Sequence, residues 1–219
     1  MRVLVIAHHG VDSPGFIGDA FEAQGAELAV HLVPDDGPLP ALDGVEHVVV
    51  LGAESSVNDP HPWIAEELAW LRAADAAGVP VFGICFGAQA ICAAFGGGVE
   101  AIGSLEVGWR LVDVADPDVI PAGPWLEFHG DRCLLPPAAT VLARNEVGVQ
   151  AFRLGRHLAV QFHPEVDGAQ LKRWLDAGGY DEQKLGFDPE QFLADTIREE
   201  PAARERAAGL VAAALTSRG

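Results

Sequence analysis

The sequence has little positive charge. Its 219 residues include 14 Lys and Arg against 32 Asp and Glu, which gives a formal net charge of −18. Nucleic acids and anionic membrane surfaces repel such a chain. We therefore expect no nucleic-acid partner and no membrane partner, although the charge does not name a substrate.

Cysteine is also sparse, and long apolar runs are missing. Cys85, Cys92 and Cys133 lack the dense, even spacing of a secreted disulfide scaffold. No apolar run approaches the roughly 18 residues that a membrane-spanning helix needs. No signal-peptide core develops before His8 and His9. We expect a cytoplasmic protein with free thiols.

Apolar residues are nevertheless abundant, at 49 % of the chain. This content excludes a disordered chain, and the absence of a short fixed period excludes a collagen or a coiled coil. A chain of this length can bury one sizeable core. We expect a single domain over residues 1–219, with C-terminal helices from about residue 180.

Short apolar runs and helical patterns alternate through the first part of the chain. The expected strands are 3–7, 28–33, 47–51 and 79–84, and the expected helices are 17–24, 63–77 and 86–95. Such alternation predicts a parallel sheet. Apolar runs separated by Pro, Gly and Asp predict further strands, several of them antiparallel, at 109–115, 125–135, 140–145, 149–154 and 157–162. Helical stretches are expected at 169–177, 189–199 and 202–215.

The segment Gly83-Ile84-Cys85-Phe86-Gly87 gives the strongest chemical signal. Glycines lie two positions before and after Cys85, at a predicted strand-to-helix junction. A sharp turn of this kind projects its central side chain over the helix N-terminus, where unpaired N–H groups and the helix dipole favour a thiolate. We interpret Cys85 as a nucleophile. The alternative is an ordinary buried cysteine, which is our interpretation of Cys92 and Cys133.

A second motif, Gln161-Phe162-His163-Pro164-Glu165, lies at the end of a predicted strand. A nucleophilic cysteine needs a base, and His163 can take the thiol proton while Glu165 orients the imidazole. The alternative is a surface His and Glu in a polar turn.

Together these two motifs resemble those of the class I glutamine amidotransferases. The resemblance covers residues 3–174 and includes Gly52–Val57, Gly108-Trp109 and His129–Asp131. It implies a three-layer, flavodoxin-like α/β fold, with a mainly parallel sheet that an antiparallel edge extends.

The resemblance also implies a catalytic triad of Cys85, His163 and Glu165 that attacks the side-chain amide of glutamine. An oxyanion hole would be formed by the N–H groups of Phe86 and of the Gly52-Ala53 segment. The family commonly has two glycines at the latter position, and alanine disfavours a positive φ by about 1 kcal/mol. We therefore expect an oxyanion hole that is either preset or less efficient, with Ala53 as its N–H donor.

By the same resemblance, Gln89 holds the amino-acid end of the substrate. Gly52 belongs to the same binding site, and Phe128, Gly130 and Asp131 bind the substrate largely through backbone groups.

No cofactor and no metal site are expected, because Cys/His pairs such as C-x-x-C are absent. We interpret His129 as structural. His8 and His9 should border the site, because the carboxyl ends of parallel strands line the binding crevice.

The resemblance therefore implies an amidotransferase or glutaminase whose ammonia passes to water or to a synthetase on another chain. Its substrate would be a small molecule, either glutamine or another γ-glutamyl compound. The alternatives are a hydrolase of other γ-glutamyl amides and a catalytically idle binding module of the same fold.

Overall fold

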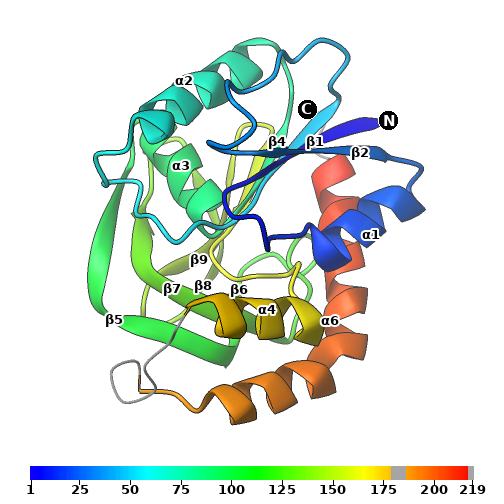
Figure 1. Cartoon of the computed structure of the whole chain (residues 1–219), viewed down its shortest axis with the longest axis vertical. Helices are drawn as coiled ribbons and strands as arrows, with labels where there is room; N and C mark the ends of the chain where they lie inside the picture. The colour runs from blue at the N-terminus through cyan, green and yellow to red at the C-terminus, as the bar shows by residue number, and fades with distance from the viewer. Residues whose placement is uncertain (179–185, 217–219) are drawn as a thin grey trace.

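The computed structural model describes residues 1–178 and 186–216 (Figure 1). The main sheet has the strand order β2-β1-β3-β4-β10-β9-β8-β6. Its first five strands run parallel: β2 (Glu27–Leu32), β1 (Arg2–Ala7), β3 (His47–Val50), β4 (Val81–Ile84) and β10 (His157–Val160). The predicted parallel sheet is confirmed. The expected onset of the C-terminal helices near residue 180 lies outside the described residues.

An antiparallel edge extends this sheet beyond β10. There β10 pairs with β9 (Val149–Leu154), followed by β8 (Thr140–Arg144) and β6 (Asp113–Val114). A separate antiparallel ribbon is formed by β5 (Gly98–Leu111) and β7 (Pro124–Leu134). The expected antiparallel edge is thus confirmed.

The prediction of a strand at 109–115 was wrong in its extent. Strand β5 begins at Gly98, and β6 is a separate short strand. Most of β5 is exposed or half-buried, and its register with β7 shifts between Ala101 and Glu106. Its sequence therefore lacks the regular alternation that a half-buried strand needs to be recognised.

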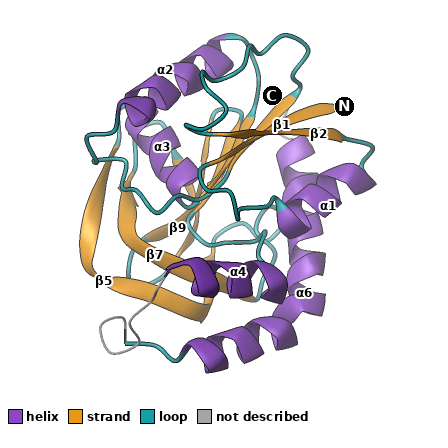
Figure 2. Ribbon diagram, viewed as in Figure 1, coloured by secondary structure: helices purple, strands orange, loops and turns teal. Residues whose placement is uncertain are grey.

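Helices cover both faces of the main sheet (Figure 2). Buried odd-numbered residues of β1 belong to the same core as α1 (Gly15–Ala23) and α6 (Pro189–Thr216), whereas the even-numbered residues pack with α2 (Pro62–Ala76) and α3 (Phe86–Ala94). The result is the expected three-layer α/β fold. Helix α4 (Gly168–Gly178) packs against α6.

Helix α6 corrects the expectation of two C-terminal helices. It continues from Pro189 to Thr216 through Pro201, and Figure 1 shows its orange first part and its red last part running in different directions. Proline removes one hydrogen-bond donor and bends a helix without always ending it. Buried residues on both sides of the proline, Phe192 and Leu210 among them, hold the two parts against the rest of the chain.

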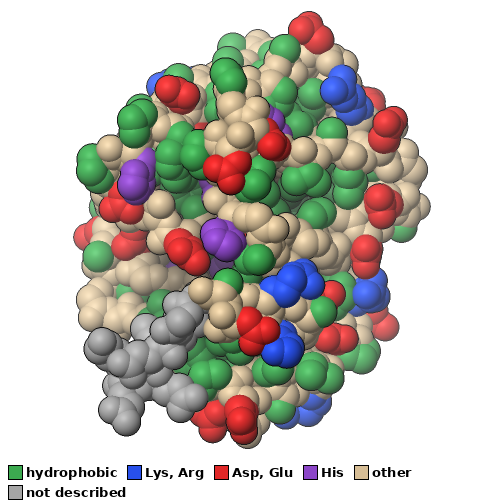
Figure 3. Space-filling model, in the orientation of Figure 1, with side chains coloured by type: hydrophobic (Ala, Val, Ile, Leu, Met, Phe, Trp, Pro, Cys, Tyr) green, Lys and Arg blue, Asp and Glu red, His purple; other side chains and the backbone are tan. Residues whose placement is uncertain are grey.

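The surface reflects the charge imbalance. Acidic side chains outnumber basic ones on the face shown in Figure 3. None of the described helices has the length and apolar content needed to cross a lipid bilayer.

Candidate active site

A cavity of about 440 Å³ lies at the carboxyl ends of the parallel strands. Eight of the residues predicted for the site line it: Gly52, Ala53, Cys85, Gln89, Phe128, Gly130, Asp131 and His163. The other two, Phe86 and Glu165, are almost fully buried next to Cys85 and His163. The structure therefore brings together segments that lie far apart in the sequence, at the edge where α/β sheets bind ligands.

Cys85 occupies a strained turn between β4 and α3. Its φ of 52° and ψ of −105° make it the one non-glycine residue with a positive φ in the described part of the chain. A Cβ on Gly83 would lie 2.6 Å from the backbone of Gly87, and a Cβ on Gly87 would lie 2.3 Å from Val50 O. The two glycines are therefore required by close backbone contacts, as the sequence suggested.

Hydrogen bonds hold the Cys85 backbone on both sides. Its N–H donates to Val160 O over 2.8 Å, and its C=O accepts from Gln89 N over 3.1 Å. Phe86 is the first residue of α3, so its N–H belongs to the first turn and has no partner within the helix. This N–H and the positive end of the helix dipole stabilise negative charge near the sulfur.

His163 and Glu165 form a buried pair beside the cysteine. His163 Nδ1 lies 2.8 Å from Glu165 Oε1, and the His163 backbone N–H donates to Leu126 O over 2.8 Å. Because an ionised carboxylate only accepts, the imidazole proton lies on Nδ1. His163 Nε2 is then left for the Cys85 side chain, which hydrogen-bonds the imidazole.

Gly52 lies close to both His163 and Cys85. A Cβ on Gly52 would lie 3.0 Å from His163 Cε1 and 3.7 Å from Cys85 Cβ. The imidazole and the cysteine therefore flank the same small space. A side chain at position 52 would push the imidazole out of place.

Electrostatics favours a charged imidazole at this position. Burial opposes the charge on His163, but the negative charges of Glu165 and Cys85 outweigh it, so the pKa of His163 lies well above its usual value. A thiolate–imidazolium pair is the arrangement that activates a cysteine nucleophile.

The Gly52-Ala53 segment has an ordinary backbone conformation. Neither residue has a positive φ, so Ala53 occupies its place without the strain expected from a Gly-to-Ala difference. The Gly52 carbonyl lies 2.8 Å from His8 Nδ1. His8 is therefore not simply at the border of the site, as expected, but buried beneath this segment, whereas His9 does line the cavity.

The expected substrate-binding residues are tied to one another. The Gln89 amide donates to Asp131 O and to Gln161 Oε1, both over a long 3.4 Å. Ser56 donates to Asp131 Oδ2 over 2.5 Å, and His129 Nδ1 lies 2.8 Å from Asp131 O. These contacts fix residues 129–131 of β7 at the cavity wall.

Comparison with known proteins identifies the family of this chain. The family model of class I glutamine amidotransferases matches residues 17–177. This chain belongs to that family. GMP synthase [glutamine-hydrolyzing] from Brucella melitensis biotype 1 is 38 % identical over 111 residues, which cover 43 % of this chain and 22 % of the relative. The chain thus spans about a fifth of the length of the curated relatives that it matches.

Solved structures match this chain over nearly its full length. A glutamine amidotransferase from Thermotoga maritima has a TM-score of 0.90 and 26 % identity and covers 98 % of both chains. One from Methylobacillus flagellatus has a TM-score of 0.88 and 25 % identity, over 99 % of this chain and 94 % of the other.

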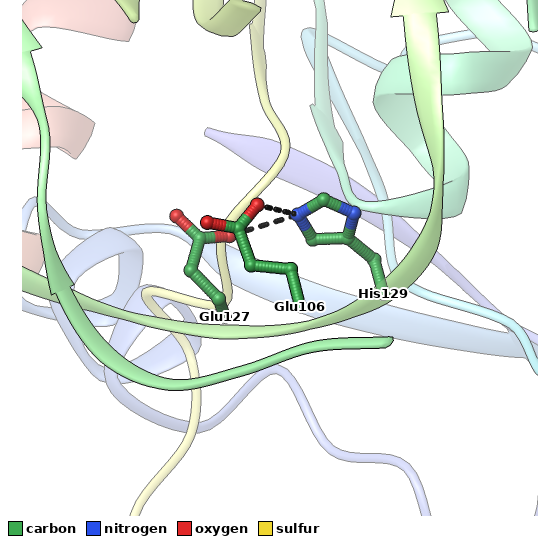
Figure 4. A group of neighbouring side chains, drawn as sticks. All are labelled: Glu106, Glu127 and His129. Carbon is green, nitrogen blue, oxygen red and sulfur yellow. Dashed lines mark ion pairs between the residues drawn. The ribbon is translucent and has the colours of Figure 1, made fainter. Parts of the chain in front are cut away.

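A cluster that the sequence did not reveal lies at the wall of this cavity. Figure 4 shows Glu106 and Glu127 pointing toward His129. His129 Nε2 lies 3.0 Å from Glu106 Oε2 and 3.2 Å from Glu127 Oε2. The signal was the alternation of Glu127 and His129 on one face of a predicted strand, but β5, which pairs Glu106 with His129, was not predicted there.

The hydrogen-bond chemistry of this cluster fixes the charge of His129. Its Nδ1 faces a carbonyl and its Nε2 faces two carboxylates, so both nitrogens must donate. Burial opposes that charge, but Glu106 and Glu127 outweigh it and raise the pKa of His129 to about 10. His129 is an imidazolium at neutral pH.

The same three residues are the candidate metal ligands within the described residues. Each offers one ligand atom, and these atoms lie within 4.8 Å of one another. Imidazole and carboxylate suit a cation such as Zn²⁺. His129 would have to lose its Nε2 proton first, and that proton already accounts for the close approach of both carboxylates.

Proposed function

We propose that the chain hydrolyses the side-chain amide of glutamine to glutamate and ammonia through a thioester on Cys85. The observation that carries this proposal is the placement of Cys85 and His163 around one small space, with His163 Nδ1 held 2.8 Å from Glu165. One imidazole nitrogen is thereby fixed, and the other is left for proton transfer.

In the first half of the reaction, the Cys85 sulfur attacks the side-chain carbonyl carbon of glutamine. The carbonyl oxygen becomes an oxyanion, which the N–H groups of Phe86 and Ala53 stabilise. His163 then gives the proton from Nε2 to the departing nitrogen. The C–N bond breaks, ammonia leaves, and the glutamyl group remains bound to sulfur as a thioester.

In the second half, water attacks the thioester carbon. His163 Nε2 takes a proton from this water, the oxyanion forms at the same position, and the C–S bond breaks. Glutamate leaves, and the thiolate–imidazolium pair is restored. Glu165 keeps the imidazole proton on Nδ1 throughout and stabilises the charged ring.

The cavity wall supplies the remaining binding groups of the proposal. Gln89 and the backbone of Phe128, Gly130 and Asp131 would hold the amino-acid end of glutamine, with Gly52 lining the side next to the sulfur. The carbonyl that reacts would then lie between Cys85 and the oxyanion donors.

The proposed acceptor of the ammonia rests on analogy with the curated relatives. The curated relatives are GMP synthases, and this chain matches only a small part of their length. We propose that ammonia passes to a synthetase on another chain or, in its absence, is released to water. A reducing cytoplasm would suit the three free cysteines, Cys85 among them.

Ammonia release from glutamine by the purified chain tests the proposal. The matched pair is Cys85→Ala and Cys92→Ala, because Cys92 is a buried cysteine of the same helix, two turns further on. We expect Cys85→Ala to abolish release and to retain glutamine binding, and Cys92→Ala to retain turnover. Equal turnover in Cys85→Ala and the wild-type chain would contradict the proposal.

Two further readouts separate the alternatives. A panel of substituted γ-glutamyl amides turned over much faster than glutamine would indicate a γ-glutamyl hydrolase. Diazo-oxo-norleucine, a glutamine-like electrophile, should alkylate Cys85, as located by mass spectrometry of the labelled peptide. An idle binding module predicts no label there.

A further inference from the structure

A second buried histidine–carboxylate pair lies directly beneath the proposed oxyanion hole. His8 follows β1, and Glu67 belongs to α2 on one face of the sheet. His8 Nδ1 lies 2.8 Å from Gly52 O, and His8 Nε2 lies 3.0 Å from Glu67 Oε2. The two side chains are 2 % and 0 % exposed. The triad proposed above uses neither of them.

Both nitrogens of His8 face acceptors, so this ring also donates twice. Burial opposes its charge, but the hydrogen bond and the charge of Glu67, together with the Gly52 carbonyl, raise the pKa of His8 above its usual value. Aromatic rings fix the plane of the imidazole: its centroid lies 4.8 Å from that of Phe86 and 5.3 Å from that of Trp63.

The carbonyl that His8 holds determines where the next N–H points. The Gly52–Ala53 peptide is trans, and in a planar trans peptide the C=O and the following N–H point in opposite directions. With the Gly52 C=O directed at His8, the Ala53 N–H is directed away from it. No acceptor for this N–H occurs among the described residues, and both Gly52 and Ala53 line the cavity.

We propose that His8, held by Glu67, is a positioning residue that fixes the Gly52–Ala53 peptide with the Ala53 N–H available to the oxyanion. This inference rests on the proposed hydrolysis. Because the carbonyl is already bound, the hole is present before substrate arrives, and no peptide rotation is needed. An alanine at position 53 is then tolerated, since the bound orientation requires no positive φ there.

The test variant is the double substitution His8→Phe with Glu67→Leu. Phenylalanine keeps a ring against Phe86 and Trp63 but donates no hydrogen bond, and leucine avoids leaving a carboxylate buried alone. The matched control is His157→Phe. His157 is also buried, accepts a hydrogen bond from a backbone N–H (Val81) and pairs with an acid (Asp75), but lies at the opposite end of the sheet.

We expect kcat for glutamine hydrolysis to fall about 10- to 100-fold in the double variant, with KM changed less than about threefold. A loss confined to kcat is the signature of an oxyanion interaction, because the substrate carbonyl in the ground state gains little from it. The control should retain the wild-type kcat. An unchanged kcat in a folded double variant would overturn the inference.

Glu67→Gln provides a conservative variant. Its amide can donate to His8 Nε2, which leaves the His8 proton on Nδ1 and the bond to Gly52 O intact. We expect it to retain most of kcat. A kcat as low as that of the double variant would contradict the assigned role of the Nδ1–H bond.

A crystal structure of the double variant supplies a readout that needs no activity. The Gly52 carbonyl should turn from its wild-type direction or occupy more than one orientation, whereas an unmoved peptide would overturn the inference. If the wild-type chain releases no ammonia, the proposed function fails. The crystal structure of the double variant still shows whether His8 determines the orientation of the Gly52–Ala53 peptide.

Discussion

His163 and His129 both lie at the cavity and are buried beside glutamates, but their hydrogen-bond partners suit them to different roles. His163 has one nitrogen on Glu165 and the other toward the Cys85 side chain. His129 has an acceptor at each nitrogen. A ring whose second nitrogen faces the nucleophile can exchange a proton with substrate, whereas a ring with an acceptor at each nitrogen keeps its protons. His129 is therefore suited to a structural role in the cavity wall, and His163 is suited to proton transfer.

His163→Gln should give the largest effect on turnover. Glutamine retains a polar side chain of similar reach but cannot shuttle a proton, so kcat should fall about 1,000-fold. Steady-state ammonia release, with circular dichroism as the check on folding, measures it. A loss of less than about tenfold would remove His163 from the proton transfer.

His129→Leu should act on stability. It leaves Glu106 and Glu127 buried without a counter-charge and should lower the free energy of unfolding by roughly 3–5 kcal/mol. Glu106 keeps amide donors from Asn145 and Gln150, whereas no amide of the described residues donates to Glu127. Adding Glu127→Leu should therefore recover part of the loss in urea denaturation. A double variant less stable than the single one would refute this view of the cluster.

The pH dependence of stability tests the structural role of His129. The pKa of His129 is about 10 in the folded chain and near 6.5 when unfolded, so its contribution is complete below about pH 6.5 and is lost as the pH rises through about 10. Between pH 7 and 9, its share should lower the free energy of unfolding by about 1.4 kcal/mol per pH unit.

The comparison uses wild type and His129→Leu/Glu127→Leu, because the other titrating histidines are common to both. The double variant should show a shallower decline in urea midpoint from pH 7 to 9. Parallel declines would mean that His129 does not hold its extra proton.

The smallest expected effects concern neighbouring residues of the oxyanion segment. Gly52→Ala places a Cβ 3.0 Å from His163 Cε1 and should displace the ring, lowering kcat about tenfold. Ala53→Gly changes a residue with ordinary φ and should lower stability by no more than about 1 kcal/mol, with kcat within about threefold of wild type. The reverse order of effects on kcat would contradict the assigned geometry.

The sequence predicted the parts of the site that depend on local rules. The turn at Cys85 needs glycines two positions away on either side, and this pattern is visible without a structure. The strands that precede Cys85 and His163 are fully buried and therefore appear in the sequence as continuous apolar runs.

The missed features depend on pairing between distant residues. Glu106 meets His129 only because β5 pairs with β7 in a particular register, and β5 carries too weak a pattern to be predicted at that point. Likewise, His8 appeared to border the site because the sequence does not show that Glu67 of α2 lies beneath it. Composition and periodicity do not predict which buried polar side chains contact one another.

The most direct test of the account is acid quenching of the chain during glutamine turnover, followed by mass spectrometry of its peptides. The account predicts a glutamyl adduct on the peptide that contains Cys85, present in wild type and Cys92→Ala and absent from Cys85→Ala. Steady production of glutamate with no adduct on Cys85 at any quench time would contradict it.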